Sequence, residues 1–128
     1  MKYFSIGCAL LLSGFSFSQT IRLKKKYLKT YEGQIPAYSI NTGVALQEVA
    51  AVKIELALTK DSMYVTVGKA KYAGTYVATK EIKNEYQLIG TMEQSGIKEV
   101  FQFSAKTGEL TRKGIFPQPD AALKPKQD

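Results

Sequence analysis

The side chains that most often carry catalysis are scarce in this chain of 128 residues. It contains no His and no Trp, and its one Cys is Cys8. Because imidazole and thiolate supply the usual general base, nucleophile and zinc or copper ligands, mechanisms and metal sites of those kinds are excluded once Cys8 is removed with the leader described below. Only an oxygen-ligated cation remains, and Asp61-Ser62-Met63 is typical of a hairpin turn rather than of a calcium loop. We expect no metal site and no cofactor.

Paired carboxylates are the remaining route to catalysis, as in glycosidases. The candidates are Glu81, Glu85, Glu93, Glu99 and Glu109. Nearly all of them lie beside turn residues or on polar strand faces, which indicates solvated surface. The ten glycines are scattered and none opens a helix after a strand, so no phosphate-binding loop is predicted. We therefore expect no enzymatic activity.

Tyrosines are the residues best suited to binding, because an aromatic body with a hydroxyl tip accommodates ligands that are partly apolar and partly polar. The candidate ligand-lining residues are Tyr64, Tyr72, Tyr76 and Tyr86. Tyrosine is also a common strand residue that packs without further function. Both interpretations remain open from the sequence.

A cluster of lysines is the second candidate site. Lys24, Lys25, Lys26 and Lys29 form the densest positive cluster of a chain whose net charge is +7. Such a cluster attracts anionic partners such as lipopolysaccharide, acidic glycans or nucleic acid. The alternative is a solvated strand face or a flexible leader, and export from the cytoplasm argues against nucleic acid.

The first residues have the pattern of a secretory signal peptide. Lys2 precedes an apolar run from Tyr3 to Leu12, and small residues at Ser16 and Ser18 place signal cleavage before Gln19. The run is too short for a membrane-spanning helix. We expect residues 1–18 to be removed together with Cys8, leaving a periplasmic or secreted protein with no disulfide and no transmembrane segment; an uncleaved anchor is the alternative.

From Val52 onward, short segments of alternating apolar and polar residues are separated by turn residues, as in an antiparallel meander. The predicted strands are residues 52–59, 63–67, 72–79, 85–92, 97–104 and 109–113. Gly74 inside the third of them suggests a bulge or a tight bend. We predict an all-β fold, an antiparallel meander of about six to eight strands that forms a small β-barrel or half-barrel.

The flanking segments are less regular. Gln34–Ile40 is predicted as a strand in which Pro36 requires an edge or a bulge, and residues 44–51 could form one or two turns of helix. The prolines and polar residues after Gly114 predict a flexible polar tail over residues 115–128. The expected organisation is a signal peptide (1–18), one β domain (19–114) and this tail.

The turn and strand rhythm of Gly74-Thr75-Tyr76, Lys83 to Leu88 and Thr107 to Leu110 loosely resembles small exported bacterial β-proteins of the lipocalin-like kind. The resemblance covers residues 52–113. The Gly-x-Trp signature of lipocalins is absent, so no binding residue is carried over. Two functions follow as expectations: a non-catalytic barrel that binds a small apolar or amphiphilic ligand, or an interaction protein that uses a basic face or strand edges on an anionic envelope component.

Overall fold

The structure is a computed structural model that describes residues 20–115 and 117–127. The expected signal peptide and its cleavage site before Gln19 lie outside these residues. The described chain is all-β, with one short 3-10 turn, η1 (Lys25–Tyr27). Its strands are β2 (Thr20–Ile21), β3 (Thr30–Ile35), β4 (Tyr38–Asn41), β5 (Leu46–Val49), β6 (Val52–Leu58), β7 (Ser62–Val67), β8 (Ala70–Ile82), β9 (Glu85–Met92), β10 (Lys98–Ser104), β11 (Glu109–Arg112) and β12 (Ala121–Pro125).

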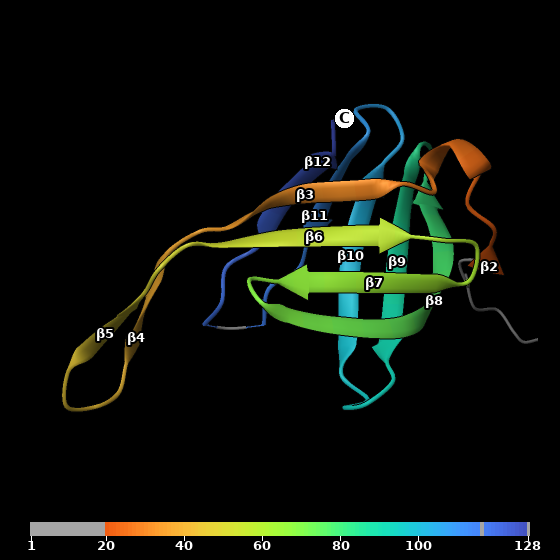
Figure 1. Ribbon diagram of the computed structural model, residues 1–128. Coiled ribbons are helices and arrows are strands. Elements are labelled where there is room, and N and C mark those ends of the chain that lie inside the picture. Colours follow the sequence, from red (N-terminus) through yellow and green to blue (C-terminus); the bar gives the residue numbers. More distant parts are fainter. Residues whose placement is uncertain (1–19, 116, 128) are drawn as a thin grey trace, which may run out of the picture.

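Eight antiparallel strands close into a barrel (Figure 1). From β6 to β12 each strand pairs with the next one along the chain, which is the predicted meander. β3 pairs with β6 on one side and with β12 on the other, so the first and last strands of the barrel complete the ring. The sequence-based prediction of a small antiparallel barrel is confirmed.

Alternation along each strand sends apolar side chains into the barrel. In β7, Met63 and Val65 are buried while Tyr64 between them is half-exposed on the outer surface. The interior around Gly90 is filled by a side chain, because a Cβ there would lie 2.3 Å from the sulfur of the buried Met63. The buried apolar residues are Tyr31, Ile35, Ile54, Leu56, Leu58, Met63, Val65, Ala78, Leu88, Met92, Phe101, Phe103, Leu110, Ala121 and Leu123.

β8 is the longest strand and pairs with β7 along one edge and with β9 along the other. Its first part pairs with β7, and β9 begins to pair with it at Gly74. A Cβ at Gly74 would lie 2.2 Å from the carbonyl oxygen of Thr91, so this glycine permits the close approach of β9. Of the two irregularities expected at Gly74, a bulge or a tight bend, the bulge is instead found between Lys80 and Ile82, where the β8–β9 register shifts.

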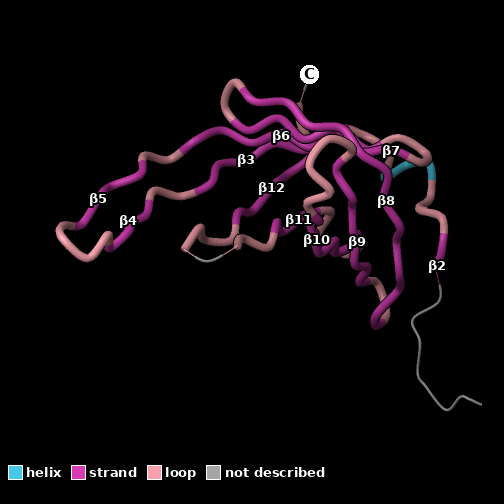
Figure 2. Tube along the Cα trace, turned by 90° about the horizontal axis from the view of Figure 1, so that it is seen from below, coloured by secondary structure: helices cyan, strands magenta, loops and turns pink. Residues whose placement is uncertain are grey.

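Two expectations for the N-terminal third are wrong. Residues 44–51 contain no helix, because Leu46–Val49 forms β5, and Gln34–Ile40 is not one strand, because β3 ends at Ile35 before Pro36. β4 pairs with β5 as a separate two-stranded sheet. Since β3 and β6 pair at its base, the β4–β5 hairpin, here called the arm, extends the same ribbon away from the barrel (Figures 1 and 2).

The expectation of a flexible C-terminal tail is also wrong for residues 121–125, which form a strand. Ala121–Pro125 forms β12, which pairs with both β11 and β3, and Leu123 is fully buried. The prolines do not prevent this pairing: Pro117 and Pro119 precede the strand and Pro125 is its last residue. Ala121 and Leu123 face inward, and they alternate with the exposed Ala122 and Lys124.

The antiparallel order places alternate connections at opposite ends of the barrel. The chain before β3 and the β6–β7, β8–β9 and β10–β11 turns share one end. There Tyr27 of η1 packs edge-on against Phe103, with centroids 4.7 Å apart, and Leu23 and Leu28 also pack against the core. We call this the closed end. The arm, the β7–β8 and β9–β10 turns and the β11–β12 loop surround the other end, the mouth.

Candidate functional site

The mouth contains a pocket of about 390 Å³. It is bounded by the arm, the β9–β10 turn and the β11–β12 loop, and most of its wall is apolar. Its lining residues are Tyr38, Ile40, Val67, Tyr72, Met92, Ser95, Ile97, Glu99, Arg112, Ile115, Pro117 and Gln118. Ile97 and Ile115 are 50% and 64% exposed, so the pocket presents apolar surface that the protein itself leaves uncovered.

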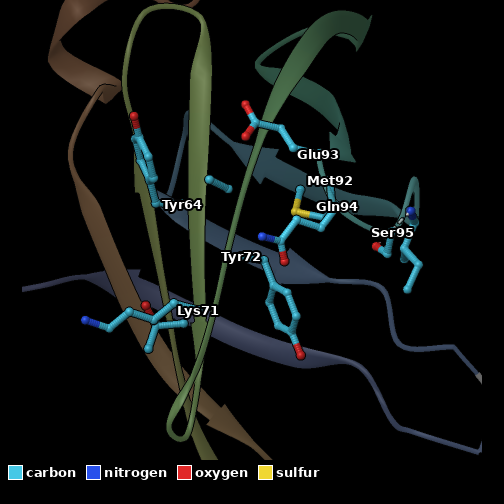
Figure 3. Close-up of a pocket in the computed structure, with 10 residues that line it drawn as sticks. Tyr64, Lys71, Tyr72, Met92, Glu93, Gln94 and Ser95 are labelled. Carbon is cyan, nitrogen blue, oxygen red and sulfur yellow. Dashed lines mark hydrogen bonds between the residues drawn. The ribbon is translucent and has the colours of Figure 1, made fainter.

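A second pocket of about 340 Å³ adjoins the mouth pocket (Figure 3). It shares Tyr72, Met92, Ser95 and Ile97 with the mouth pocket and adds Tyr64 from the outer face of β7. We call it the side slot. Tyr72 borders both pockets and is 46% exposed, so its ring stands between them.

The side slot exists because β8 and β9 separate near the mouth. Their ladder begins at the Gly74–Met92 pair, and a last backbone bond runs from Glu93 N–H to the Ala73 carbonyl at 2.9 Å. Beyond that point, residues 70–72 pair only with β7. The β9–β10 turn therefore stands away from the start of β8, and the barrel wall is open between them.

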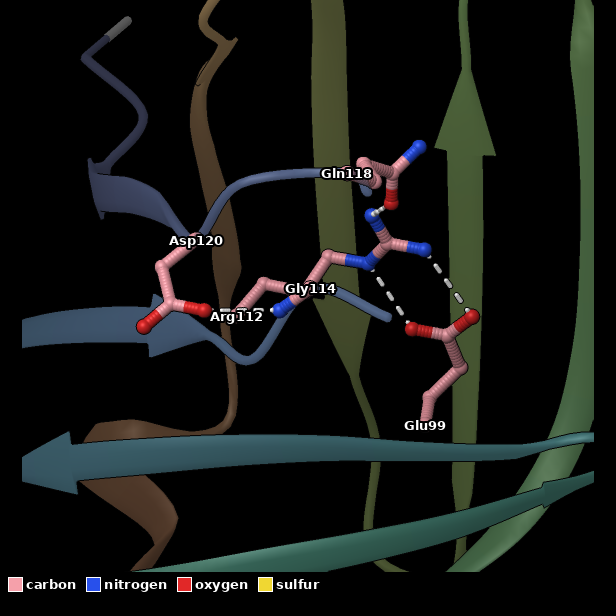
Figure 4. Close-up of polar contacts among 5 residues, drawn as sticks. All are labelled: Glu99, Arg112, Gly114, Gln118 and Asp120. Carbon is pink, nitrogen blue, oxygen red and sulfur yellow. Dashed lines mark hydrogen bonds and ion pairs between the residues drawn. The ribbon is translucent and has the colours of Figure 1, made fainter. Parts of the chain in front are cut away.

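An ion pair forms the polar floor of the mouth pocket (Figure 4). Arg112 Nε and Nη2 donate to Glu99 Oε1 and Oε2 at 2.8 and 3.0 Å, and Nη1 donates to Gln118 Oε1. The two charged side chains are only 9% and 11% exposed. This two-pronged geometry is the strongest form of a guanidinium–carboxylate contact and fixes both side chains.

The β11–β12 loop holds Gln118 in place. Gly114 N–H donates to Asp120 Oδ1 at 2.8 Å (Figure 4). Gln118 N–H donates to the Ile115 carbonyl at 2.8 Å. Gly114 is required by this fold of the loop, because a Cβ there would lie 2.2 Å from the Gln118 carbonyl oxygen. The loop is thus a structured wall of the mouth.

The four candidate tyrosines lie in two different places. Tyr72 borders the mouth pocket and the side slot, and Tyr64 lines the slot from outside. Tyr76 and Tyr86 belong to the closed end: the Tyr76 hydroxyl donates to the Thr59 carbonyl at 2.7 Å, and Tyr86 stacks on Phe103. Burial also raises the pKa of Tyr76, with a smaller contribution from Asp61.

The candidate lysines lie at the closed end. Lys25 and Lys26 belong to η1, Lys24 precedes it, and Lys29 lies just before β3; all four are exposed. The Lys26 ammonium sits 5.2 Å from the centre of the Tyr27 ring. The cluster is therefore neither a strand face nor a flexible leader. Its lysines lie in or beside the 3-10 turn η1, whose Tyr27 packs against the barrel core.

Several mouth residues were not singled out in the sequence, among them Tyr38, Ile40, Ile97 and Ile115. The interpretation of the glutamates as surface groups is wrong for Glu99, which is buried. The alternation of residues along the strands could have predicted this burial. Glu99 is in phase with Phe101 and Phe103, and Arg112 is in phase with Leu110, so both charged side chains face inward.

The described residues contain no group of three or more acidic, His or Cys side chains placed to hold a metal ion. Among these residues there is also no helix of the length and apolar character needed to span a bilayer. The chain matches no known family model, no curated protein and no solved structure in the comparisons with known proteins.

Proposed function

We propose that this protein is an exported, non-catalytic binding protein that takes a small amphiphilic ligand in the mouth of its barrel. The observation that carries the proposal is the mouth pocket, in which an apolar wall surrounds a buried polar floor. Its volume of about 390 Å³ is within the range of small-molecule sites, roughly 300 to 1,000 Å³, and barrel mouths commonly hold such sites. The packed interior directs the ligand to the mouth rather than to the barrel axis.

The floor favours a ligand with an uncharged head group. Arg112 and Glu99 neutralise each other, so a charged head would either lack a free partner or have to break a two-pronged ion pair. The guanidinium has five N–H groups, of which three donate to Glu99 and Gln118, which leaves two for a hydroxyl or carbonyl oxygen. The ligand class is therefore an apolar chain or ring that ends in a neutral hydrogen-bonding group.

Export is the part of the proposal that rests on the leader sequence alone. Its measure is the mass of the protein recovered from expressing cells. Cleavage before Gln19 gives a mature N-terminus that starts at Gln19 or at its cyclised pyroglutamate form. An intact Met1 on a cytosolic protein contradicts export and leaves the ligand site unaffected.

Ligand binding is tested with three probes that share a twelve-carbon chain: monolaurin, dodecanoate and dodecylamine. Titration calorimetry below the micelle-forming concentrations is expected to give the tightest binding for monolaurin, whose glyceryl head is uncharged. Tighter binding of either charged probe overturns the neutral-head inference. No binding of any probe to the mouth overturns the proposed function.

Two isoleucines provide matched variants for this test. Ile115 lines the mouth and Ile82 lies near the closed end, and both are 64% exposed. Ile115→Ser should weaken monolaurin binding several-fold, because it removes apolar wall that the ligand covers. Ile82→Ser changes the same chemistry at equal exposure and should leave the affinity unchanged. Equal effects of both variants show that the probe binds nonspecifically.

A further inference from the structure

The closed end of the barrel gathers positive charge from four separate stretches of sequence. The segment before β3 contributes its lysine cluster, and three turns add further lysines that the sequence keeps far apart. The lysines of these four stretches are Lys24, Lys25, Lys26, Lys29, Lys60, Lys80, Lys83 and Lys106. All eight are exposed, and we call them the basic end.

Hydrogen bonds hold these segments together. Leu58 N–H donates to the Lys29 carbonyl at 3.1 Å, which fixes the end of the lysine cluster beside β6. Ala105 N–H donates to the Asn84 carbonyl at 2.8 Å, so the two turns that carry Lys83 and Lys106 lie side by side. The relative positions of the charges are thus set by the barrel.

The charge at this end is largely uncompensated. In the described part of the chain, the lysines that form ion pairs are Lys53, Lys113, Lys124 and Lys126. None of the eight lysines named above is among them, although Lys126 lies near this end, where its N–H donates to the Thr30 carbonyl. The acidic residues near the lysines are Asp61, Glu81, Glu85 and Glu109. Glu81 accepts a hydrogen bond from Gln102, and Glu109 pairs with Lys124. Eight lysines therefore outweigh four carboxylates there.

An exposed apolar residue at the same end distinguishes between anionic partners. Ile82 is 64% exposed and lies between Lys80 and Lys83, where the register shift ends β8. An exposed apolar side chain adds nothing to the binding of a soluble polyanion. It does add to the binding of a bilayer, because the lysines contact the head groups while the apolar side chain enters the boundary of the acyl chains.

We infer that the basic end docks on the surface of an anionic lipid bilayer. The mouth lies at the opposite end of the barrel, so docking leaves it open to solution (Figure 1). The inference uses none of the residues that line the mouth pocket, and it holds whether or not that pocket binds monolaurin.

The test is co-sedimentation with vesicles of phosphatidylcholine that contain about 30% phosphatidylglycerol, compared with phosphatidylcholine alone. Wild type should bind the anionic vesicles and be released as the salt rises, because exposed charges are screened over about 8 Å at physiological ionic strength. Binding to both vesicle types alike, or binding indifferent to salt, overturns the inference. Binding to heparin with none to anionic vesicles identifies a soluble polyanion and also overturns it.

Matched charge variants locate the surface. Lys83→Gln with Lys106→Gln removes two charges from the basic end, and Lys69→Gln with Lys98→Gln removes two exposed charges near the mouth. A lysine close to an anionic bilayer contributes about 1 kcal/mol, so the first pair should weaken binding about tenfold or more and the second pair little. Replacing Lys24, Lys25, Lys26 and Lys29 together by Gln should have a still larger effect. Equal losses from the two pairs contradict a defined docking end.

The two isoleucine variants of the ligand test are used again with their roles exchanged, so that Ile82→Ser is the test and Ile115→Ser is the control. Ile82→Ser should weaken binding to anionic vesicles, and Ile115→Ser should not. Unchanged vesicle binding by Ile82→Ser contradicts insertion into the bilayer. Circular dichroism spectra that match wild type verify that all of these surface variants fold.

Discussion

At the scale of single residues, the Arg112–Glu99 ion pair carries a large desolvation cost, because both charged side chains are buried. Two charges removed from water are stabilised only while both are present, and removal of one leaves the other buried and unpaired. Gln118 occupies part of the remaining donor capacity of the guanidinium. Apolar side chains of similar volume would avoid the desolvation cost that this buried pair carries.

Replacement of Arg112 by Met should therefore lower the free energy of unfolding by about 3 to 5 kcal/mol, because it strands the Glu99 carboxylate. The double change Arg112→Met with Glu99→Met should restore most of that loss, since neither charge is then buried alone. Urea denaturation of the three proteins measures both effects. A double variant no more stable than the single one would show that the ion pair itself holds the fold.

Tyr31 provides a second prediction at this scale. Burial, with smaller contributions from Tyr27 and Tyr76, raises the pKa of its hydroxyl from 10.0 to about 12. In the unfolded chain the group titrates near 10, so between about pH 10 and 12 unfolding releases a proton and the free energy of unfolding falls by up to about 1.4 kcal/mol per pH unit. Below pH 10 the contribution is fully present.

The measurement is urea denaturation of wild type and Tyr31→Phe at a series of alkaline pH values. The variant also loses the 2.9 Å hydrogen bond to the Tyr27 carbonyl, so its stability at pH 8 is the reference for its own curve. Above pH 10 wild type should lose stability more steeply than Tyr31→Phe. Parallel curves would mean that other groups, such as lysines, account for the alkaline loss.

At the scale of elements, β12 is the strand that closes the sheet into a barrel. It is short and contains one charged residue, Lys124, and a terminal proline, yet it closes the ring between β11 and β3. Without it, β3 and β11 would each expose an edge that can pair with other chains. The stability of the whole sheet therefore depends on a segment with little strand character of its own.

Leu123→Ala tests this dependence. The side chain is fully buried, so its truncation should lower the free energy of unfolding by about 2 to 5 kcal/mol. The neighbouring Lys124→Ala removes a side chain that is 74% exposed and whose contact with Glu109 is a surface ion pair at 3.9 Å, and it should change stability by less than about 1 kcal/mol. Thermal melts of both variants give the comparison. A harmless Leu123→Ala would mean that residues 121–125 contribute no packing.

At the scale of the whole molecule, the barrel and the arm differ in how they are supported. Every barrel strand has a partner on both sides and a packed interior. The arm has two strands only, and near its tip Val44 and Leu46 are 94% and 70% exposed. An isolated two-stranded hairpin is marginally stable in water, so the arm depends on its base at β3 and β6.

Hydrogen exchange read by mass spectrometry should show this division. Amides of β6, β7, β9 and β10 should exchange slowly, through opening of the whole barrel, whereas amides of residues 38–49 should exchange faster by local fraying. Saturation of the protein with monolaurin should slow exchange in β4, because Tyr38 and Ile40 line the mouth pocket. An arm as protected as the barrel in the free protein would indicate that another molecule covers it.

The sequence by itself determined the strands from Val52 to Arg112, because the period-2 alternation and the turn residues between segments are local signals. It also excluded the chemistry of His and Trp throughout and concentrated charge in Lys24 to Lys29. What it could not determine depends on residues that are far apart in the chain. β12 is a strand because β3 and β11 provide partners for it, and its own residues resemble a polar tail.

Only the tertiary structure decided where the candidate groups meet. The fold places Tyr72 at the mouth and Tyr76 and Tyr86 at the closed end, although Tyr72 and Tyr76 share β8 and Tyr86 lies on the neighbouring β9. Strand parity could have placed Glu99 and Arg112 inside, but their contact depends on the register of β10 against β11. Register and closure are set by pairing over the whole ring, so local composition carries little information about them.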